Sequence, residues 1–444
     1  MRLIFVFISV MLFSSSMAQQ HTGFAYHDSL TYNLYLEGRW KDLSEAGRAA
    51  LDEGHDYYYM RMRIGISLYE RSYYAAAAKH FRRALDLNSG DPVATEYLFY
   101  CHLYTGEFGS ASRMLESMAG DQSSRVREES RLANNTIWLS MYYNDFHTDD
   151  IFDSPSDWFA DTQPGTVTVT RLIVNPSVSM SHQVSPGVYY NHSFNNVTKH
   201  SLLDYYDGTR LIYLDNHKVL QNQYRGSFTI AGAGGLSFTP WAHFALVTYD
   251  YILAGGSYSS GFYSVQRASK VHYSLGMNVR QRTGYISVDG SLAVNRYGTN
   301  AAIQADAGIV VYPFGNNWFY AGIRSSGVFH NKTTLSEINP VYVLTTGFSV
   351  PGIFSIDVSS INGDLRNYSA GNGLYLFNSP DYITQRLLLN LSVPLSKKSG
   401  LTLYAGGGRN SHATSLYTLD NQITEFNKIV YHSFNINGGL LWNF

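Results

Sequence analysis

The sequence ends with FNINGGLLWNF (Phe434–Phe444), in which every second residue, beginning with Phe434, is apolar or glycine. Most of the residues between them are asparagine or glycine. Because successive side chains of a β-strand point to opposite faces, this alternation predicts a strand with one apolar and one polar face. Chain ends are usually frayed and polar, so a patterned aromatic end indicates a strand that belongs to the folded structure.

The same alternation continues through most of the chain from about Asn135 onward. It is clearest in VHYSLGMNVR (271–280), GYISVDGSLAVNR (284–296), AAIQADAGIV (301–310) and GIFSIDVSSI (352–361). Stretches of roughly 10 to 13 residues with this period have the length of a tilted, membrane-spanning β-strand.

Two kinds of connection separate these predicted strands, and they alternate along the chain. Short turns are expected at Val184–Pro186, Thr239–Trp241, Arg282–Gly284, Pro313–Asn317, Pro351–Gly352 and Ser396–Gly400. Long polar connections are expected near 147–165, 198–222, 253–269, 331–340, 364–382 and 412–432. Tight turns on one side and long loops on the other are typical of transmembrane β-barrels.

Residues 135–444 are therefore predicted to form an antiparallel transmembrane β-barrel of about 14 strands in the bacterial outer membrane. Closure is required because no water in the bilayer can satisfy an open sheet edge. The competing fold is a soluble β-sandwich, whose polar face is usually rich in charged residues. Here the polar face is mainly Ser, Thr, Asn and Gly, which favours the barrel.

A helical region precedes the barrel and repeats with a period of 34 residues. Trp40, Tyr74 and Phe108 are separated by this spacing, and so are Gly38, Ser72 and Gly106. The best copy, IGISLYERSYYAAAAKHFRRALDLNSGDP (64–92), resembles the tetratricopeptide repeat. The resemblance implies α-helical tetratricopeptide repeats over residues 24–120, located in the periplasm, with residues 121–134 as a linker or a last helix.

Stacked repeats of this family form a concave groove that commonly holds a partner peptide. Carried over to this chain, the family geometry places six side chains in such a groove: Tyr59, Met62, Tyr69, Glu96, Tyr100 and Tyr104. The alternative is that these residues pack only against the rest of the chain.

The two ends of the chain carry processing and assembly signals. Residues 1–18 combine Arg2, an apolar run and a small-residue site at Ser16–Ala18, which predicts a secretory signal peptide. The last strand resembles the carboxy-terminal recognition signal of bacterial outer-membrane proteins, carried here by Asn437, Gly439, Trp442 and Phe444. That resemblance implies recognition by the barrel-assembly machinery.

Catalytic, metal-binding and cofactor-binding patterns are not evident in the sequence. Adjacent Ser and His residues, as in Ser411–His412 and His432–Ser433, would point to opposite faces of a strand, so we expect no enzyme. No Cys/His metal spacing is present and no cofactor is expected. The formal net charge of −2 without a basic block argues against nucleic acid as a partner.

Placing each strand's apolar face toward lipid puts six charged residues in the lumen: Arg280, Asp289, Asp306, Arg324, Asp357 and Arg386. They would either form a neutralised network that plugs the barrel or line a solute path.

Two functions are compatible with this architecture. The first is a non-enzymatic protein, anchored in the outer-membrane lipid bilayer, whose repeats form a platform for a periplasmic or membrane protein partner in envelope assembly, export or surface transport. Helical repeats ahead of a barrel resemble the layout of YaiO-type outer-membrane proteins. The alternative is a selective outer-membrane channel or transporter for a small solute.

Overall fold

The computed structural model describes residues 23–130, 135–145, 164–206, 208, 211–255, 262–297, 300–330, 338–379, 381–396, 399–418 and 423–444. The predicted signal peptide, residues 1–18, lies outside them. Contacts divide the chain into a helical unit that ends at Val126 and a second unit that begins at Arg127. Among the described helices, none combines the length and apolar character needed to cross a membrane.

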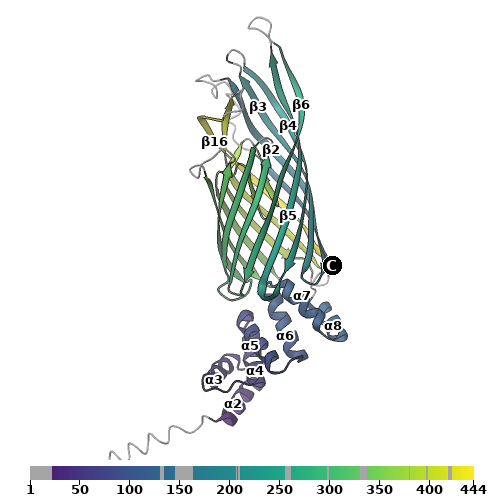
Figure 1. The fold of residues 1–444 in the computed structure, drawn as a ribbon, viewed down its shortest axis with the longest axis vertical. Coiled ribbons are helices and arrows are strands. Elements are labelled where there is room, and N and C mark those ends of the chain that lie inside the picture. The colour runs from purple at the N-terminus through teal and green to yellow at the C-terminus, as the bar shows by residue number, and fades with distance from the viewer. Residues whose placement is uncertain are drawn as a thin grey trace, which may run out of the picture. The chain divides into compact units, whose positions relative to one another are not determined.

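The first unit consists of consecutive helices joined by short turns (Figure 1). The helices are α2 (Phe24–Leu36), α3 (Trp40–Asp52), α4 (Tyr58–Glu70), α5 (Tyr74–Leu87), α6 (Pro92–Tyr104), α7 (Phe108–Ser117) and α8 (Gly120–Ser130). Helix α8 occupies most of the segment expected to be a linker or a last helix.

The 34-residue spacing marks the same turn in each helix pair. Gly38, Ser72 and Gly106 have φ angles of 66°, 62° and 76°, so each ends a first helix in the left-handed conformation. The second helix then begins two residues later, at Trp40, Tyr74 or Phe108. Helical repeats are thereby confirmed, whereas their assignment to the tetratricopeptide family stays a prediction.

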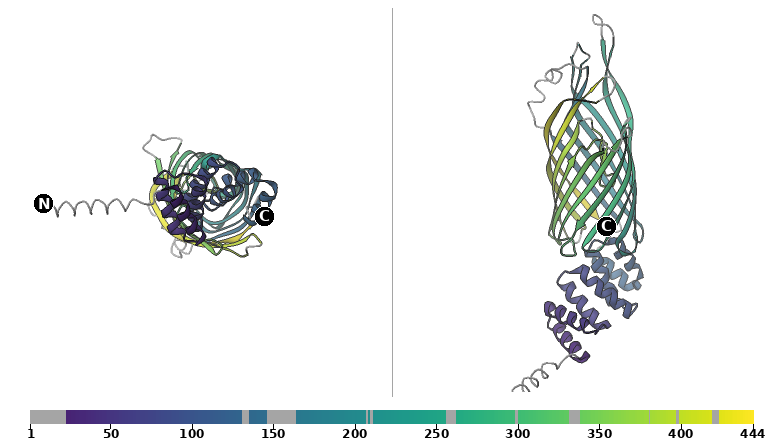
Figure 2. Two further views of the ribbon diagram at one scale, coloured as in Figure 1. Left: turned by 90° about the horizontal axis from the view of Figure 1, so that it is seen from below. Right: turned by 60° about the vertical axis from the view of Figure 1, so that its left-hand side comes forward.

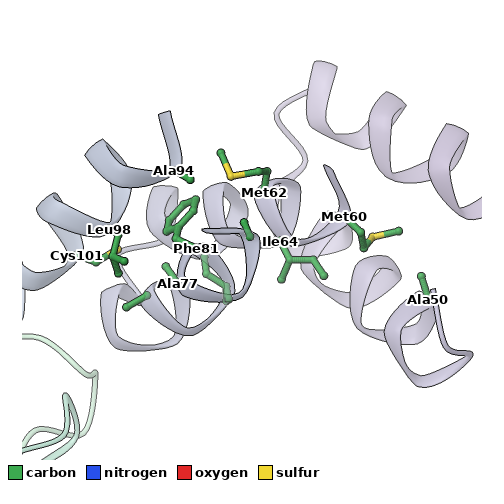
Figure 3. Packing of buried hydrophobic residues seen from close by; sticks show 12 residues of the cluster. Ala50, Met60, Met62, Ile64, Ala77, Phe81, Ala94, Leu98 and Cys101 are labelled. Carbon is green, nitrogen blue, oxygen red and sulfur yellow. The ribbon is translucent and has the colours of Figure 1, made fainter. Parts of the chain in front are cut away.

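Small residues allow these helices to pack closely. A Cβ atom on Gly65 of α4 would lie 2.7 Å from the Phe81 ring of α5, so only glycine allows this approach. Phe81 also stacks on Tyr97 of α6, with ring centroids 4.9 Å apart. Figure 3 shows Phe81, Leu98 and Met62 converging in this core, beside the buried thiol of Cys101.

Acidification will destabilise the helical unit through His80 of α5. Burial, together with the charges of Arg61 and Arg48, lowers the pKa of His80 from 6.5 to about 4. His80 therefore becomes protonated near pH 6.5 in the unfolded chain, but only near pH 4 in the folded chain. The free energy of unfolding consequently falls as the pH is lowered from 6.5 to 4. At about 1.4 kcal/mol per pKa unit the loss approaches about 3 kcal/mol. Thermal unfolding of the full chain, followed by its helical circular dichroism, measures it.

The matched control for this prediction is His80→Gln. An amide oxygen can still accept from the guanidinium of Arg61, whose Nη1 lies 3.4 Å from Nδ1 of His80, but the amide does not titrate. Helical unfolding of the variant should change little between pH 6.5 and pH 5. An equal loss in both proteins would show that other groups cause the pH dependence.

The second unit is a closed barrel of tilted strands (Figure 2). Its strands are β1 (Asn135–Asp145), β2 (Gly165–Ser185), β3 (Val188–Tyr206), β4 (Leu211–Ala231), β5 (Leu236–Gly255), β6 (Phe262–Arg282), β7 (Ile286–Tyr297), β8 (Asn300–Val311), β9 (Phe319–His330), β10 (Ile338–Val350), β11 (Phe354–Gly363), β14 (Tyr382–Pro394), β15 (Leu401–Thr418) and β16 (Ile423–Asn443). All neighbours pair antiparallel, so the prediction of a barrel of about 14 strands is confirmed.

The patterned chain end closes this barrel. Strand β16 pairs with β1, and the backbone N–H and C=O groups of Phe444 and Asn135 exchange two hydrogen bonds of 3.0 Å. The chain therefore enters and leaves the barrel at the same end. No free sheet edge remains where the first and last strands meet, as a membrane-spanning sheet requires.

Alternation along the strands separates an apolar exterior from a polar interior. In β7, the outward residues Val288 and Leu292 are 51% and 58% exposed, whereas the inward Asp289 and Asn295 are 6% and 0% exposed. The same contrast holds along β16, where Ile436 is 67% exposed. An apolar outer wall of this kind is suited to contact with lipid.

One predicted turn is wrong. Thr239–Trp241 lies inside β5, and the turn that joins β4 to β5 occupies Gly232–Gly235 instead. Proline misled the prediction because it is rare within strands. Pro240 is accommodated because the β4–β5 ladder has no pair there, stepping from Ser227↔Trp241 to Ile230↔Phe238.

Several predicted loops are also wrong in extent. Residues 198–206 and 211–222 belong to β3 and β4, and strands also extend into 253–269 and 412–432. Figure 1 shows β3, β4 and β6 rising beyond the shorter strands. These segments were predicted as loops because they are polar. Strand ends that extend past the hydrocarbon layer need no apolar face, so they can be polar and still belong to a strand. Most of 147–165 lies outside the described residues.

Candidate functional site

The segment between β11 and β14 folds into the barrel. It was expected to be a long outer loop (364–382), but it forms a short hairpin of β12 (Tyr368–Ala370) and β13 (Tyr375–Phe377) that hydrogen-bonds to the inner wall. We call residues 364–379 the inner hairpin. Tyr368 is 2% exposed, so this segment is packed like a core element.

One side of the inner hairpin is held by amides of the wall. The side chain of Gln304 on β8 donates to the carbonyl of Ser369 and accepts from its N–H, both at 2.9 Å. Asn295 on β7 donates to the carbonyl of Asn367 at 2.9 Å. These contacts satisfy backbone groups that would otherwise be buried without partners.

The turn of the hairpin is held from β4 and β5. Arg225 donates two hydrogen bonds, of 3.0 and 3.1 Å, to the carbonyl of Asn372. Nδ1 of His243 lies 2.5 Å from the carbonyl oxygen of Gly373. A Cβ atom on Gly373 would lie 2.3 Å from the Trp241 ring, so this close approach requires glycine.

The far end of the hairpin is fixed by ionisable side chains. Lys199 on β3 donates to Ser379 at 2.7 Å. Asp381, just before β14, accepts from the hydroxyl of Tyr431 at 2.6 Å and from the N–H of Thr170 at 2.9 Å. The inner hairpin is thus attached to β7 and β8 at one end and to β3 at the other, and Asp381, which follows it, is bonded to β2 and β16.

A cavity of about 610 Å³ lies between the inner hairpin and the wall. Its volume is within the range of sites that hold small ligands. The hairpin contributes Leu365 and Leu374–Ser379, and the wall contributes residues of β1–β4, β11 and β14–β16. The lining combines apolar side chains such as Phe377 with polar groups such as Asn191 and Asn195.

Arg386 on β14 lies in an aromatic cage at this cavity. Its guanidinium carbon is 5.4 Å from the ring centroid of Tyr142, 5.6 Å from Tyr375 and 5.9 Å from Phe377. Arg386 is 8% exposed, and a cation among aromatic faces is stabilised by their quadrupoles. Of the six predicted lumen charges, Arg386 and Asp357 line the cavity.

The other four predicted lumen charges have different environments. Arg324 on β9 pairs with Asp289 on β7 at 2.5 Å. The arginine reaches across β8 because Gly308 between them has no side chain. Asp306 accepts a 3.0 Å hydrogen bond from Gln304, the residue that holds the hairpin, whereas Arg280 is exposed near the end of β6.

The structure distributes the predicted groove residues differently. Met62 is 6% exposed and belongs to the helical core, and Tyr69 packs edge-on against Tyr97 with ring centroids 5.0 Å apart. Glu96 is paired with Arg125 of α8 at 2.6 Å. The three remaining side chains lie nearer the surface: Tyr59, Tyr100 and Tyr104.

The predicted assembly residues lie on both faces of β16. Trp442 and Phe444 are 46% and 49% exposed on the outside, with ring centroids 4.7 Å apart. Asn437 and Gly439 face inward, opposite Tyr142 and Ser140 of β1. Recognition of this strand by the assembly machinery stays a prediction.

Serine and histidine do meet, but across strands rather than along one. Nε2 of His412 on β15 lies 2.8 Å from the hydroxyl of Ser433 on β16. This contact was not predicted, because the two residues are 21 positions apart and meet only through strand pairing. Ser433 is 0% exposed, so the pair is a buried structural contact in this structure.

No protein-family model matches the chain, and a search of curated proteins finds no match. Among solved structures, the chain is similar to a FadL homologue from Pseudomonas aeruginosa, with 8% identity over 70% of this chain and 90% of that chain and a TM-score of 0.46. The Pseudomonas putida toluene transporter TodX gives 10% identity, coverage of 70% and 90%, and a TM-score of 0.42. A third similarity, covering 23% of this chain and 88% of the other, is to the Yersinia enterocolitica type III secretion chaperone SycD, at 20% identity and a TM-score of 0.22.

The prediction that the protein acts chiefly through a platform of repeats is wrong. TodX, one of the solved barrels to which this chain is similar, is described as a toluene transporter and a monoaromatic hydrocarbon channel. Within the molecule itself, the cavity of about 610 Å³ lies in the barrel, whereas Met62, Tyr69 and Glu96 are occupied by contacts inside the helical unit. The resemblance of layout to YaiO-type proteins stays a prediction.

Proposed function

We propose that this protein is an outer-membrane channel for a small solute, with the cavity as part of the passage and the inner hairpin as its constriction. The observation that carries the proposal is the cavity of about 610 Å³ inside a closed barrel. A barrel that served only as an anchor would need no such space.

The lining of the cavity indicates the class of solute. Leu374, Leu376 and Phe377 give the hairpin side an apolar surface, while Asn191 and Asn195 give the wall hydrogen-bonding groups. The nearby cation Arg386 has aromatic rings around it but no ion pair among the described residues. We infer a small solute that has an apolar body and one polar or anionic group.

The location follows from the same architecture. The apolar exterior suits a lipid bilayer, and closed β-barrels with an even number of strands are typical of bacterial outer membranes. The short turns lie at the end where the chain enters and leaves, which corresponds to the periplasmic side in such barrels. We therefore assign the helical unit, which precedes β1, to the periplasm as an accessory to the channel.

Filling the cavity will test the proposal. Ser179 on β2 lines it, so Ser179→Trp would place an indole in the passage. We expect solute uptake into liposomes that contain the full chain, and its single-channel conductance, to fall severalfold. Solutes that pair an apolar body with a carboxylate are compared with sugars of similar mass.

The matched control is Val178→Trp, one residue earlier on the opposite face of β2. Val178 lies against the outer surface depression beside Phe194 and Tyr224, so the added ring meets lipid. The control should conduct like the unmodified protein. Equal conductance of both variants and the unmodified protein would contradict a passage through this cavity.

A further inference from the structure

A cluster of metal-ligating side chains lies in the helical unit, apart from the barrel cavity. His27 comes from α2, Glu53 from the end of α3, and His55 from the connection to α4. One ligand atom from each of the three lies within 4.8 Å of the other two. Among the described residues, no other three His, Cys, Asp or Glu side chains meet in this way.

The backbone holds these residues in position. Gly54 has a φ of 92°, and this left-handed residue reverses the chain between Glu53 and His55 so that both face α2. The N–H of His55 bonds to the carbonyl of Ala50 at 2.9 Å, which fixes the turn. The site is therefore built on a defined turn rather than on a free loop.

Helix α2 is fixed beside the cluster by a second set of contacts. Asp28, the neighbour of His27, accepts from Tyr57 and Arg63, each at 2.6 Å. Phe24 packs on Tyr57 with ring centroids 4.8 Å apart. His27 is consequently held at one place, 5% exposed, with little freedom to leave the cluster.

The hydrogen bonds of His27 leave its ring incompletely satisfied. Nε2 lies 2.8 Å from a carboxylate oxygen of Glu53, but Nδ1 is buried without a hydrogen-bond partner. The ring of His55 lies beside it, with centroids 5.1 Å apart. A buried imidazole whose Nε2 faces a carboxylate, with a second imidazole beside it, supplies the three donors of a three-ligand zinc site.

We propose that His27, Glu53 and His55 bind a zinc ion that joins α2 to the turn after α3. Zinc–ligand distances of about 2.0–2.2 Å place tetrahedral ligand atoms about 3.4 Å apart. His27 and Glu53 would separate slightly from 2.8 Å, and His55 would approach. Rotation of the exposed Glu53 side chain, which is 39% exposed, is enough to open its distance to His27. A water molecule would be the fourth zinc ligand, on the exposed side of the site.

The donor set selects the class of metal. Two imidazoles and one carboxylate suit zinc and neighbouring transition metals, whereas magnesium and calcium prefer sites made only of oxygen ligands. Bound zinc would fasten the first helix of the unit to the hairpin that follows. Zinc should therefore raise the thermal stability of the helical unit without changing conductance.

The test uses the full chain, in detergent, with any affinity tag removed because tag histidines bind zinc. Zinc is titrated in competition with a chromogenic indicator, and Co²⁺ is used as a spectroscopic probe of tetrahedral coordination. We expect one zinc per chain, no displacement by Mg²⁺ or Ca²⁺, and a zinc-dependent rise in the midpoint of helical unfolding. His55→Ala and Glu53→Gln should each weaken binding at least about 100-fold, since even supporting residues contribute about 10- to 100-fold.

Glu107→Gln is the matched control. His102 and Glu107 also form a histidine–carboxylate contact, at 2.9 Å, but it is not part of a three-ligand cluster. This variant should bind zinc like the unmodified protein. The proposal is overturned if the chain binds less than one zinc, or if His55→Ala and Glu53→Gln bind it as tightly as the unmodified protein.

Discussion

Replacing residues 366–379 with a short glycine–serine linker will raise the single-channel conductance of the protein severalfold. The inner hairpin crosses the lumen from Gln304 on β8 to Lys199 on β3, so its removal joins the cavity to the rest of the interior. A 14-stranded wall is wider than an eight-stranded one, which side chains can fill. Planar-bilayer recordings of the full chain and the variant measure the effect.

The wall should survive this deletion because the inner hairpin is an excursion from it. Strands β11 and β14 pair directly, with Asn362 opposite Gln385, so a few residues can join them. The groups that lose partners, including Arg225 and His243, would face water in the widened lumen. Exposure to water removes most of the penalty for leaving them without protein partners.

A second variant separates the presence of the inner hairpin from its attachment. Arg225→Ala with Gln304→Ala keeps the segment but removes contacts at its turn and at β12. We expect fluctuating conductance between the levels of the full chain and of the deletion variant. Unchanged conductance in the deletion variant, with a folded barrel, would mean that the hairpin does not constrict the passage.

The barrel could be predicted because its pattern is local. Alternation with period two is a property of each strand, and it is strict in β7, where exposed and buried residues alternate from Ile286 to Tyr297. The 34-residue period was equally local, since it repeats one left-handed turn at Gly38, Ser72 and Gly106. Neither pattern depends on knowing which distant segments meet.

The inner hairpin could not be placed because its contacts are remote in sequence. Gln304 and Ser369 are 65 residues apart, and Lys199 and Ser379 are 180 apart. One signal was available: GNG (Gly371–Gly373), between the apolar ends of β12 and β13, is typical of a tight hairpin turn. Apolar residues in an expected outer loop also indicate burial.

The partners of the predicted lumen charges could not be read from the strand pattern. Arg280 is directly opposite Asp289 in the register, yet the ion pair forms between Asp289 and Arg324. Gly308 makes that longer reach possible, and a Cβ atom there would lie 3.0 Å from Asp289. Pairing depends on which neighbour lacks a side chain, which a strand pattern alone does not show.

Gly439→Val will prevent the barrel from closing. A Cβ atom at Gly439 would lie 2.0 Å from the backbone oxygen of Leu139 on β1 and 2.6 Å from the ring of Tyr404 on β15. Overpacking of this kind destabilises proteins by about 1–3 kcal/mol, and more where backbone must move. Here the backbone belongs to the seam between the first and last strands. Refolding into detergent or liposomes, followed by mobility of the unboiled protein on a gel, measures closure.

The neighbouring glycine supplies the control, because the two residues share a strand but face opposite sides. At Gly438 the nearest atom to an added Cβ is the carbonyl oxygen of Tyr404 at 3.5 Å, an ordinary contact, and the side chain would point to lipid. Gly438→Val should therefore close as the unmodified protein does, with a β-branched residue that suits a strand. Equal loss in both variants would mean that flexibility of this glycine pair, rather than space at the seam, is what closure requires. Equal closure in both would mean that β1 and β15 can move apart at this row, and that the seam is looser than the contacts at Gly439 indicate.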